Sequence, residues 1–222
     1  MILAAGRGER LRPLTDRTPK PLLEVGGATL IERHLRALAV AGIRRVVINT
    51  SHLGDQLARM LGTGEQFGVE IRFCHESPGA LETAGGVVNA LTLLNSDPFL
   101  VVNGDVWTEF EFAGVPRAID TQAHLILVDN PEHHPHGDFR IHGGRVLPLD
   151  AEYGEPLTFS GIGIYHHALF AALDPGPRPL APVLNAAARR GQVSGEHYAG
   201  GWVDVGTPER LASLRRRLGE SP

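Results

Sequence analysis

The sequence predicts an α/β fold in which helices flank a mostly parallel sheet and a small antiparallel part is inserted in the second half. Short apolar runs alternate with helix-like segments over the first fifty residues, and this alternation is typical of parallel strands joined by helices. A fully apolar run at 99–102 predicts a buried strand. The alternation is lost at about residues 130–165, where turns separate short runs that predict antiparallel strands.

Each expected element has its own local signal. Met1–Ala5 is an apolar run that stops at glycine, so it predicts a short strand. Thr29 and Glu32 have the spacing of a capping box, which begins a helix, and Thr207 followed by Pro208 predicts another helix start. Further strands are expected at 44–50, 69–76, 98–103, 123–130 and 202–204, and further helices at 53–61, 111–120 and 180–190, with one opening at residue 82 or 83.

Length and composition limit the class of protein. A chain of 222 residues suits one domain with a full core, so a single domain over residues 1–222 is expected. The net charge of −4 gives no reason to expect a nucleic acid or an anionic membrane as a partner. No apolar run has the length of a membrane span, and a single cysteine, Cys74, excludes an intrachain disulfide. A cytoplasmic protein is therefore expected; without a coiled-coil or internal repeat, no oligomeric state is predicted.

A glycine-rich, basic loop follows the first strand and is the strongest functional signal. Gly6 and Gly8 allow backbone N–H groups to converge on an anion, and Arg10 and Lys20 add positive charge. Three prolines stiffen the loop. The spacing is neither that of the dinucleotide-binding loop, whose third glycine is replaced by Leu11, nor that of the P-loop. The loop predicts a phosphate site, and an ordinary basic surface loop is the alternative.

Three later segments have signals of their own. Asp105 follows an apolar strand, and the carboxyl ends of parallel strands line the ligand crevice, so its carboxylate is expected there; a turn cap is the alternative. Gly85 and Gly86 lie in the first turn of an expected helix, where missing side chains would let a flat ring approach; a loosened helix start is the alternative. Loop histidines 133, 134 and 136 lack zinc-partner spacing and are interpreted as neighbours of phosphate.

The loop resembles the signature of the sugar-1-phosphate nucleotidyltransferases. In that family, Ala-Ala-Gly leads to Gly-x-Arg, then Pro-Leu-Thr and Pro-Lys-Pro, with a later Gly-Asp and a closing Trp-x-Asp-x-Gly-Thr-Pro. The resemblance runs from Met1 to about Leu214 and implies a Rossmann-like, nucleotide-diphospho-sugar transferase fold. The matching residues are Ala4-Ala5-Gly6, Gly8-Glu9-Arg10, Pro13-Leu14-Thr15, Pro19-Lys20-Pro21, Gly104-Asp105 and Trp202 to Pro208.

The resemblance also implies roles for individual residues. Arg10, Lys20 and Asp105 would be catalytic, and Asp105 and Asp204 would hold Mg²⁺. The segment at about 130–165 would be a sugar-binding insert. The nucleotide would contact Leu3, Ala4, Ala5, Gly6, Gly8, Pro78, Gly79, Thr83 and Gly85. The sugar phosphate would contact Asn103, Gly137, Asp138, Ser160, Gly161 and Asp204. For Asp138, a solvated turn aspartate is the alternative.

Five segments resemble a subfamily that transfers a uridylyl group from UTP to N-acetylmuramic acid α-1-phosphate in cell-wall recycling, with UDP-N-acetylmuramic acid and pyrophosphate as products. They are LETAGG, NGDVWTEFEF, LVDNPEHHPHGDF, LTFSGIGIY and SGEHYAGGWVDVGTPERL. Many family members carry a Glu-Lys-Pro lysine that this chain lacks, although Glu155 and Pro156 are present. Arg140 or a loop histidine is the expected ligand of the lactyl carboxylate. The alternatives are mannose 1-phosphate with GTP, glucose 1-phosphate with UTP or dTTP, and a nucleotide-sensing regulatory subunit without catalysis.

Overall fold

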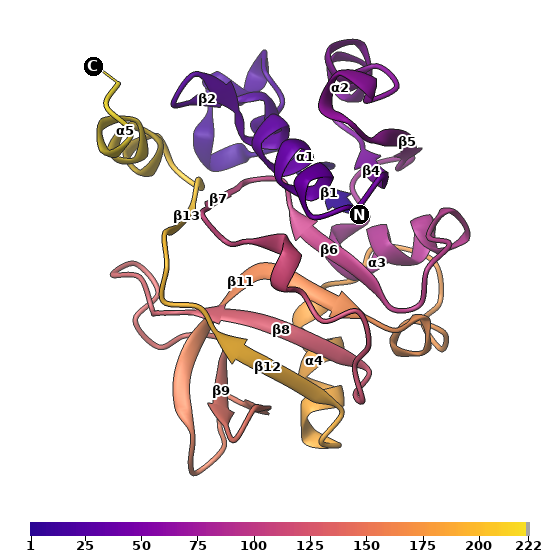
Figure 1. Ribbon diagram of the computed structural model, residues 1–222, viewed down its shortest axis with the longest axis vertical. Helices are drawn as coiled ribbons and strands as arrows, with labels where there is room; N and C mark the ends of the chain where they lie inside the picture. Colours follow the sequence, from indigo (N-terminus) through magenta and orange to yellow (C-terminus); the bar gives the residue numbers. More distant parts are fainter. Residues whose placement is uncertain (221–222) are drawn as a thin grey trace. The chain divides into compact units, whose positions relative to one another are not determined.

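The computed structural model describes residues 1–220, which divide into two compact units. The first unit contains Met1–Leu81, Asn103–Val115 and the chain from Gly201 onward. The second unit contains Glu82–Val102 and Pro116–Gly200. Figure 1 follows the chain through both units. Within the described residues, no helix is both long enough and apolar enough to cross a membrane.

The first unit contains a parallel three-stranded part of the sheet, in the order β5 (Glu70–His75), β4 (Arg45–Thr50), β1 (Ile2–Leu3). Ile2 pairs with Ile48, and Val46 pairs with Ile71, so neighbouring strands run in the same direction. The helices α1 (Leu30–Val40) and α2 (Gly54–Leu61) alternate with these strands along the chain, as the sequence predicts.

Helix α1 begins at the predicted capping box. The Glu32 backbone N–H donates to Thr29 Oγ1 at 3.2 Å, and the Thr29 backbone N–H donates to Glu32 Oε2 at 2.9 Å. The two bonds satisfy donors that a helix start leaves unpaired. Leu30, Ile31, Leu35 and Leu38 form the buried face. The signal is local, which is why the sequence alone locates this helix.

A second part of the first unit joins segments that are distant in the sequence. Strand β7 (Val106–Thr108) pairs antiparallel with β13 (Trp202–Asp204), and β13 leads into α5 (Pro208–Arg217) (Figure 1). The predicted cap of α5 is present, because Thr207 Oγ1 accepts the backbone N–H of Arg210 at 3.3 Å. A short hairpin, β2 (Glu24–Val25) with β3 (Ala28–Thr29), completes this part. One buried core holds these segments together: Leu11, Leu23, Val25, Leu30, Trp107, Val205, Leu211 and Leu214.

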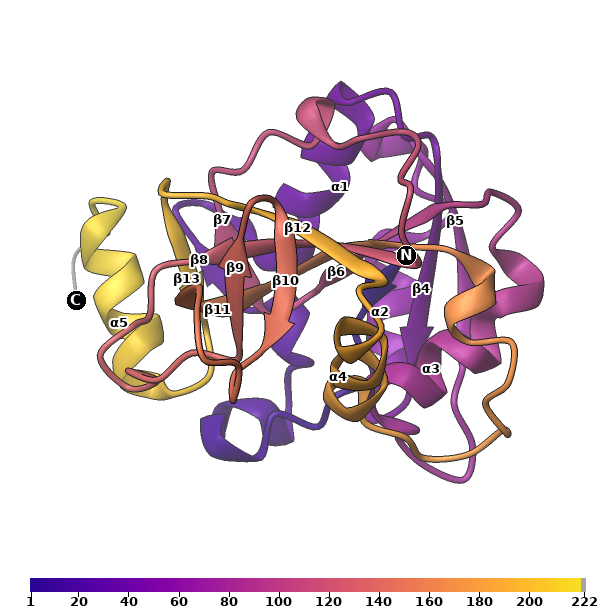
Figure 2. The same cartoon turned by 90° about the horizontal axis from the view of Figure 1, so that it is seen from below.

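The second unit is largely antiparallel. Its strands lie in the order β6 (Phe99–Asn103), β11 (Glu155–Tyr165), β8 (Ala123–Val128), β12 (Val193–His197), β10 (Arg145–Pro148), β9 (Phe139–His142). Strand β11 runs antiparallel to β6, β8 and β9, whereas β12 and β8 are parallel. Helix α4 (Leu180–Arg189) packs against β10 and β12 (Figure 2), and α3 (Glu82–Ala90) contacts α4. The sheet is therefore mixed, and its antiparallel part is larger than the sequence predicts.

One predicted helix is wrong. Residues 111–120 contain only a single 3₁₀ turn, Phe112–Gly114. Pro116 disfavours a helical conformation at the residue before it, and Gly114 weakens a helix further. Other 3₁₀ turns lie at Glu9–Leu11, Leu14–Asp16, Lys20–Leu22, Glu65–Phe67, Leu91–Leu93 and His167–Leu169.

Candidate active site

The glycine-rich loop folds back on itself after β1. Gly8 has a left-handed φ of 68°, and a Cβ there would lie 2.9 Å from Thr15 Cγ2. Thr15 Oγ1 donates to the Gly8 carbonyl at 2.8 Å, which fixes the turn. The same Cβ position is 3.5 Å from the Cβ of Lys20, so the fold brings Lys20 next to Gly8. Gly6 has open space where its side chain would be, as a loop that admits a ligand requires.

Lys20 and Asp105 form an ion pair in which Lys20 Nζ donates to Asp105 Oδ2. The Lys20 side chain is 11% exposed and that of Asp105 is 37% exposed, so the lysine is largely enclosed and the carboxylate faces solvent in part. The structure thus brings together two of the three predicted catalytic residues, which are far apart in the sequence.

Gly104 explains how Asp105 reaches the loop. The Gly104 N–H donates to the Leu3 carbonyl at 2.9 Å, and a Cβ at Gly104 would lie 2.7 Å from that same oxygen. It would also lie 3.2 Å from Ile2 Cγ2. Only glycine allows this approach without displacing backbone, so Gly104 is a requirement of packing.

Asp204 lies beside Asp105 although about a hundred residues separate them in the sequence. In the β7–β13 pair, Asp204 is the partner of Val106, and the Val205 N–H donates to the Asp105 carbonyl at 2.9 Å. The backbones of the two aspartates are therefore held next to one another. Sequence spacing carries no information on this pairing, and only the resemblance implied it.

Arg210, which the sequence analysis missed, binds Asp204. Arg210 Nη1 donates to Asp204 Oδ1 at 2.6 Å and also to Oδ2, and the arginine side chain is only 17% exposed. Arg210 lies in the first turn of α5, where the helix dipole favours acidic residues. A basic residue in that turn is the sequence signal that could have identified it.

Arg10 lies close to Arg210, next to Gly206. A Cβ at Gly206 would lie 2.1 Å from Arg210 Nη2 and 3.2 Å from Arg10 Nη2, so two guanidinium groups converge at this glycine. Each of the three charged residues Arg10, Asp204 and Arg210 is followed by a residue of the buried core that contains Trp107; these are Leu11, Val205 and Leu211. Buried neighbours thus fix the backbone beneath each of these charges.

A buried chain of hydrogen bonds connects β1 to the segment before α3. The Ala4 N–H donates to Asn49 Oδ1 at 2.7 Å, and Asn49 Nδ2 donates to Glu76 Oε1 at 2.6 Å. Glu76 Oε2 accepts the Leu81 N–H at 2.6 Å, and Glu76 is 2% exposed. The chain links two predicted nucleotide-binding segments, one at residues 3–8 and one that includes Pro78 and a Gly79 with open space beside it.

Sequence reasoning missed this chain of hydrogen bonds. The sequence signal that could have identified it is a polar residue at the end of a mostly apolar strand: Asn49 lies near the end of β4, and Glu76 directly follows β5.

His34 lies beneath the strand that follows Asp105. It is 3% exposed, and its Nε2 is 2.9 Å from the Val106 carbonyl, to which it donates. Burial lowers the pKa of His34 to about 4, although the Val106 carbonyl and the Asp105 charge oppose this change. A neutral histidine thus fixes β7 from the side of α1.

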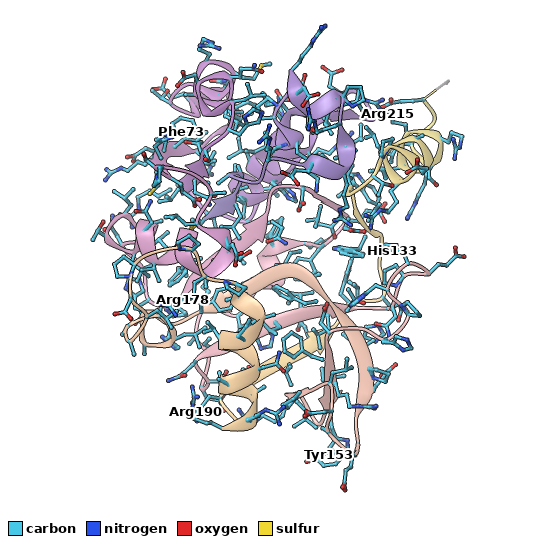
Figure 3. The ribbon with its side chains drawn as sticks, turned by 180° about the vertical axis from the view of Figure 1, so that it is seen from behind. Phe73, His133, Tyr153, Arg178, Arg190 and Arg215 are labelled. Carbon is cyan, nitrogen blue, oxygen red and sulfur yellow. The ribbon has the colours of Figure 1, made fainter. Side chains whose placement is uncertain are left out.

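The physical reason given for Gly85 is wrong. The space next to Gly85 is filled by the chain itself, because a Cβ there would lie 2.2 Å from the Gly176 carbonyl oxygen. The N–H groups of Ala84 and Gly85 donate to the carbonyl of Arg178, at 2.9 and 3.1 Å; Arg178 is labelled in Figure 3. Gly85 therefore serves packing within the second unit, and nucleotide contacts by Gly85 and Thr83 stay predictions.

The predicted sugar-binding residues in the second unit have structural partners. Asp138 Oδ2 accepts the Phe159 N–H at 2.8 Å, and its Oδ1 is 3.1 Å from His134 Nε2. Ser160 is 1% exposed and donates to the Ile126 carbonyl at 2.7 Å.

The two predicted glycines are also explained by local geometry. Gly161 has a φ of 81° where the register of β11 shifts against β8, which marks a bulge. At Gly137, with a φ of 70°, a Cβ would lie 2.6 Å from both the Leu157 carbonyl and Asn130 Oδ1. The structure thus explains these residues by packing, and sugar contacts stay predictions.

Arg140, one of the expected ligands of a lactyl carboxylate, makes two local hydrogen bonds. Its Nε donates to the Leu149 carbonyl at 3.0 Å, and its Nη1 donates to the Gly154 carbonyl at 2.7 Å. These bonds tie the ends of β9 and β10 to the turn before β11. These bonds give Arg140 a role in local structure, and a contact with a lactyl carboxylate stays a prediction.

Comparisons with known proteins identify the family of this chain. The family model described as nucleotidyl transferase matches residues 1–139. An N-acetylmuramate alpha-1-phosphate uridylyltransferase of Neisseria meningitidis serogroup B is 47% identical, over 99% of this chain and 97% of that protein. A protein of the same name from Caulobacter vibrioides is 35% identical over 100% of this chain and 97% of its own length.

Solved structures share the fold. A protein described as a glucose-1-phosphate thymidylyltransferase from Bacillus anthracis superposes with a TM-score of 0.83 at 23% identity, over 100% of this chain and 95% of that one. HddC from Yersinia pseudotuberculosis, complexed with GMP-PN, gives 0.79 at 19% identity, over 97% of both chains. The predicted fold class and the family resemblance are confirmed: the chain belongs to the nucleotidyl transferase family.

Proposed function

We propose that this chain transfers a uridylyl group from UTP to N-acetylmuramic acid α-1-phosphate and releases pyrophosphate. Two relatives that match over nearly their whole length are named N-acetylmuramate alpha-1-phosphate uridylyltransferase. The observation that carries the proposal is the Lys20–Asp105 ion pair beside a glycine-rich loop, with the backbone of Asp204 next to that of Asp105. Because these residues all belong to the first unit, one packed body can present them together.

The reaction needs no general base to create its nucleophile. The second ionisation of a phosphate monoester lies near pH 6, so the attacking oxygen of a sugar 1-phosphate is already anionic at neutral pH. The difficulty is the approach of two anions, and fixed positive charge together with alignment supplies most of the catalysis. This requirement matches a site rich in basic side chains and carboxylates.

The residues of the loop have separate tasks in this proposal. Lys20 is preorganised by its ion pair with Asp105, and it neutralises the α-phosphate or the sugar phosphate as they approach. Arg10 stabilises the departing pyrophosphate. The N–H groups at Gly6 and Gly8 contact the nucleotide, with Leu3, Ala4 and Ala5 leading into the turn.

The two aspartates fit a magnesium ion that is shared with substrate. Mg²⁺ is usually held by one or two carboxylates, substrate phosphates and water. Asp105 and Asp204 supply two carboxylates from adjacent backbones, and within residues 1–220 no cluster of three or more acidic, histidine or cysteine side chains forms a complete ion cage. When bound, the ion would neutralise phosphate charge; Asp105 and Asp204 are the residues that would hold it.

The remaining sequence predictions belong to this proposal. Asn103, at the end of β6, contacts the sugar phosphate, and the antiparallel segment at about 130–165 recognises the sugar as part of a single domain over residues 1–222. The cytoplasmic location also stays a prediction.

Pyrophosphate release across a substrate panel tests the proposal. Each of UTP, GTP, dTTP and CTP is combined with the 1-phosphates of N-acetylmuramic acid, N-acetylglucosamine, mannose and glucose. We expect the highest kcat/KM for UTP with N-acetylmuramic acid α-1-phosphate. A higher value for another pair would change the substrate assignment, and no release with any pair by the folded protein would favour a regulatory subunit. Lys20→Ala protein is the control for contaminating activity.

A further inference from the structure

Arg210 occupies the carboxylate that the proposed function gives to a divalent cation. Its Nη1 contacts both oxygens of Asp204, with 2.6 Å to Oδ1, and the pair is mostly enclosed, since the side chains are 17% and 28% exposed. A cation that ligates Asp204 binds an oxygen that the guanidinium already contacts, so the two positive charges weaken each other's binding to the carboxylate. Two positive partners therefore compete for one carboxylate.

The surroundings of Arg210 show which groups lie near its guanidinium if a cation displaces it from Asp204. Arg10 Nη2 and Arg210 Nη2 both lie within 3.3 Å of the point where a Cβ of Gly206 would be. Neighbouring guanidinium groups repel one another unless an anion lies near both. Asp204 provides that negative charge to Arg210 in this structure. Without Asp204, the two arginines form a site for a polyanion such as pyrophosphate or the terminal phosphates of a nucleotide.

The fold keeps Arg210 in reach of both partners. Its backbone is fixed in the first turn of α5 by the Thr207 cap and by Leu211 in the buried core. Gly206 leaves the space in which the guanidinium lies, since any side chain there would collide with it. An exchange of anionic partners would therefore involve the Arg210 side chain and not the backbone of α5.

We infer that Arg210 is a phosphate-binding residue whose charge is masked by Asp204 until a divalent cation takes that carboxylate. The cation then occupies Asp204, and Arg210 joins Arg10 in holding the pyrophosphate part of the substrate and product. Binding of the cation and of the pyrophosphate group are coupled through this exchange, and such coupling is reciprocal. The inference rests on the proposed function, because it takes Asp204 as a ligand of the cation.

The first claim to test is that Arg210 competes with a divalent cation for Asp204. The protein is titrated with Mn²⁺ in the absence of nucleotide and phosphate, and binding is followed by electron paramagnetic resonance. We expect Arg210→Gln to raise Mn²⁺ affinity about 5- to 150-fold, the usual range for coupled sites, because it removes the competing positive charge. Arg216→Gln is the matched control, since it removes an exposed arginine from the same helix. Unchanged or weaker Mn²⁺ binding in Arg210→Gln, with Tm within a few degrees of wild type, would overturn the inference.

Inhibition by the product pyrophosphate tests the second claim, that Arg210 contacts the pyrophosphate group. With Mg²⁺ present, we expect Arg210→Gln to raise the inhibition constant of pyrophosphate at least about tenfold, as loss of a charge-assisted hydrogen bond does. Arg210→Lys keeps the charge without the planar fork and is expected to lie between wild type and Arg210→Gln. An unchanged inhibition constant in Arg210→Gln would refute the phosphate contact.

A further variant separates this inference from the proposed function. Asp204→Asn is expected to lose Mn²⁺ affinity. If Asp204→Asn binds Mn²⁺ as wild type does, the proposed metal site itself fails. If Asp204→Asn loses Mn²⁺ while Arg210→Gln behaves as Arg216→Gln does, only the exchange fails and the metal site stands.

Discussion

Replacing His34 by glutamine should remove a defined part of the pH dependence of stability. Burial lowers the pKa of His34 from 6.5 to about 4. Between these values His34 is protonated in the unfolded chain and neutral in the folded one, so unfolding takes up a proton. The free energy of unfolding therefore falls as the pH falls from 6.5 towards 4, and the contribution of His34 is fully present only above pH 6.5.

The expected magnitude follows from the same values. Each unit of pKa corresponds to about 1.4 kcal/mol, so His34 accounts for a loss of about 2 kcal/mol between pH 7 and pH 5. Glutamine can keep the donor to the Val106 carbonyl, which His34 Nε2 approaches to 2.9 Å, and it does not titrate. The variant should thus lose about 2 kcal/mol less stability than wild type over this range.

Urea denaturation at pH 5, 6 and 7, followed by the fluorescence of the two tryptophans, measures these free energies. His136→Gln, in which an exposed histidine is replaced, is the control for loss of a histidine. If His34→Gln loses as much stability as wild type between pH 7 and pH 5, the assignment of a buried neutral histidine beneath β7 is wrong.

Three further substitutions test the site. Lys20→Ala should lower kcat at least about a hundredfold, because it removes an oriented charge; near-normal kcat in folded protein would contradict the assignment. Gly104→Ala should lower stability by about 1 to 3 kcal/mol in urea denaturation, because its Cβ meets the Leu3 carbonyl, and unchanged stability would refute that contact. Glu76→Gln places a donor against the N–H of Asn49 or Leu81, so it should cost about 1 to 3 kcal/mol. The exposed Glu70→Gln is its control, and equal stabilities would refute the buried chain of hydrogen bonds.

Features with local causes were predictable from the sequence. The capping box at Thr29 and Glu32 and the Thr-Pro start of α5 depend on residues within one helical turn, and both are confirmed. The glycine and proline pattern of residues 4–21 similarly locates the loop next to β1. In contrast, the helix predicted at 111–120 does not form, and Pro116 together with Gly114 is the physical reason.

Features that depend on distant partners were not predictable from local pattern. The pairing of Asp204 with Val106 brings two aspartates together, and no spacing rule encodes it. Arg210 and Glu76 resemble ordinary charged residues until the fold supplies their partners. The antiparallel direction of β11 relative to β6 and β8 was also not predictable, because composition indicates that a strand forms but not which strands it pairs with.

The joint action of Asp105 and Asp204 is tested most directly by comparing kcat/KM for wild type, Asp105→Asn, Asp204→Asn and the double variant, with folding checked by Tm. If both carboxylates hold one ion, removing either abolishes the same function, so each single variant should lose at least about a hundredfold and the double variant should be little worse than the poorer single one. Losses that multiply in the double variant would show that the two aspartates act independently. A near-normal kcat/KM in one single variant would show that the aspartate replaced in it does not belong to the site.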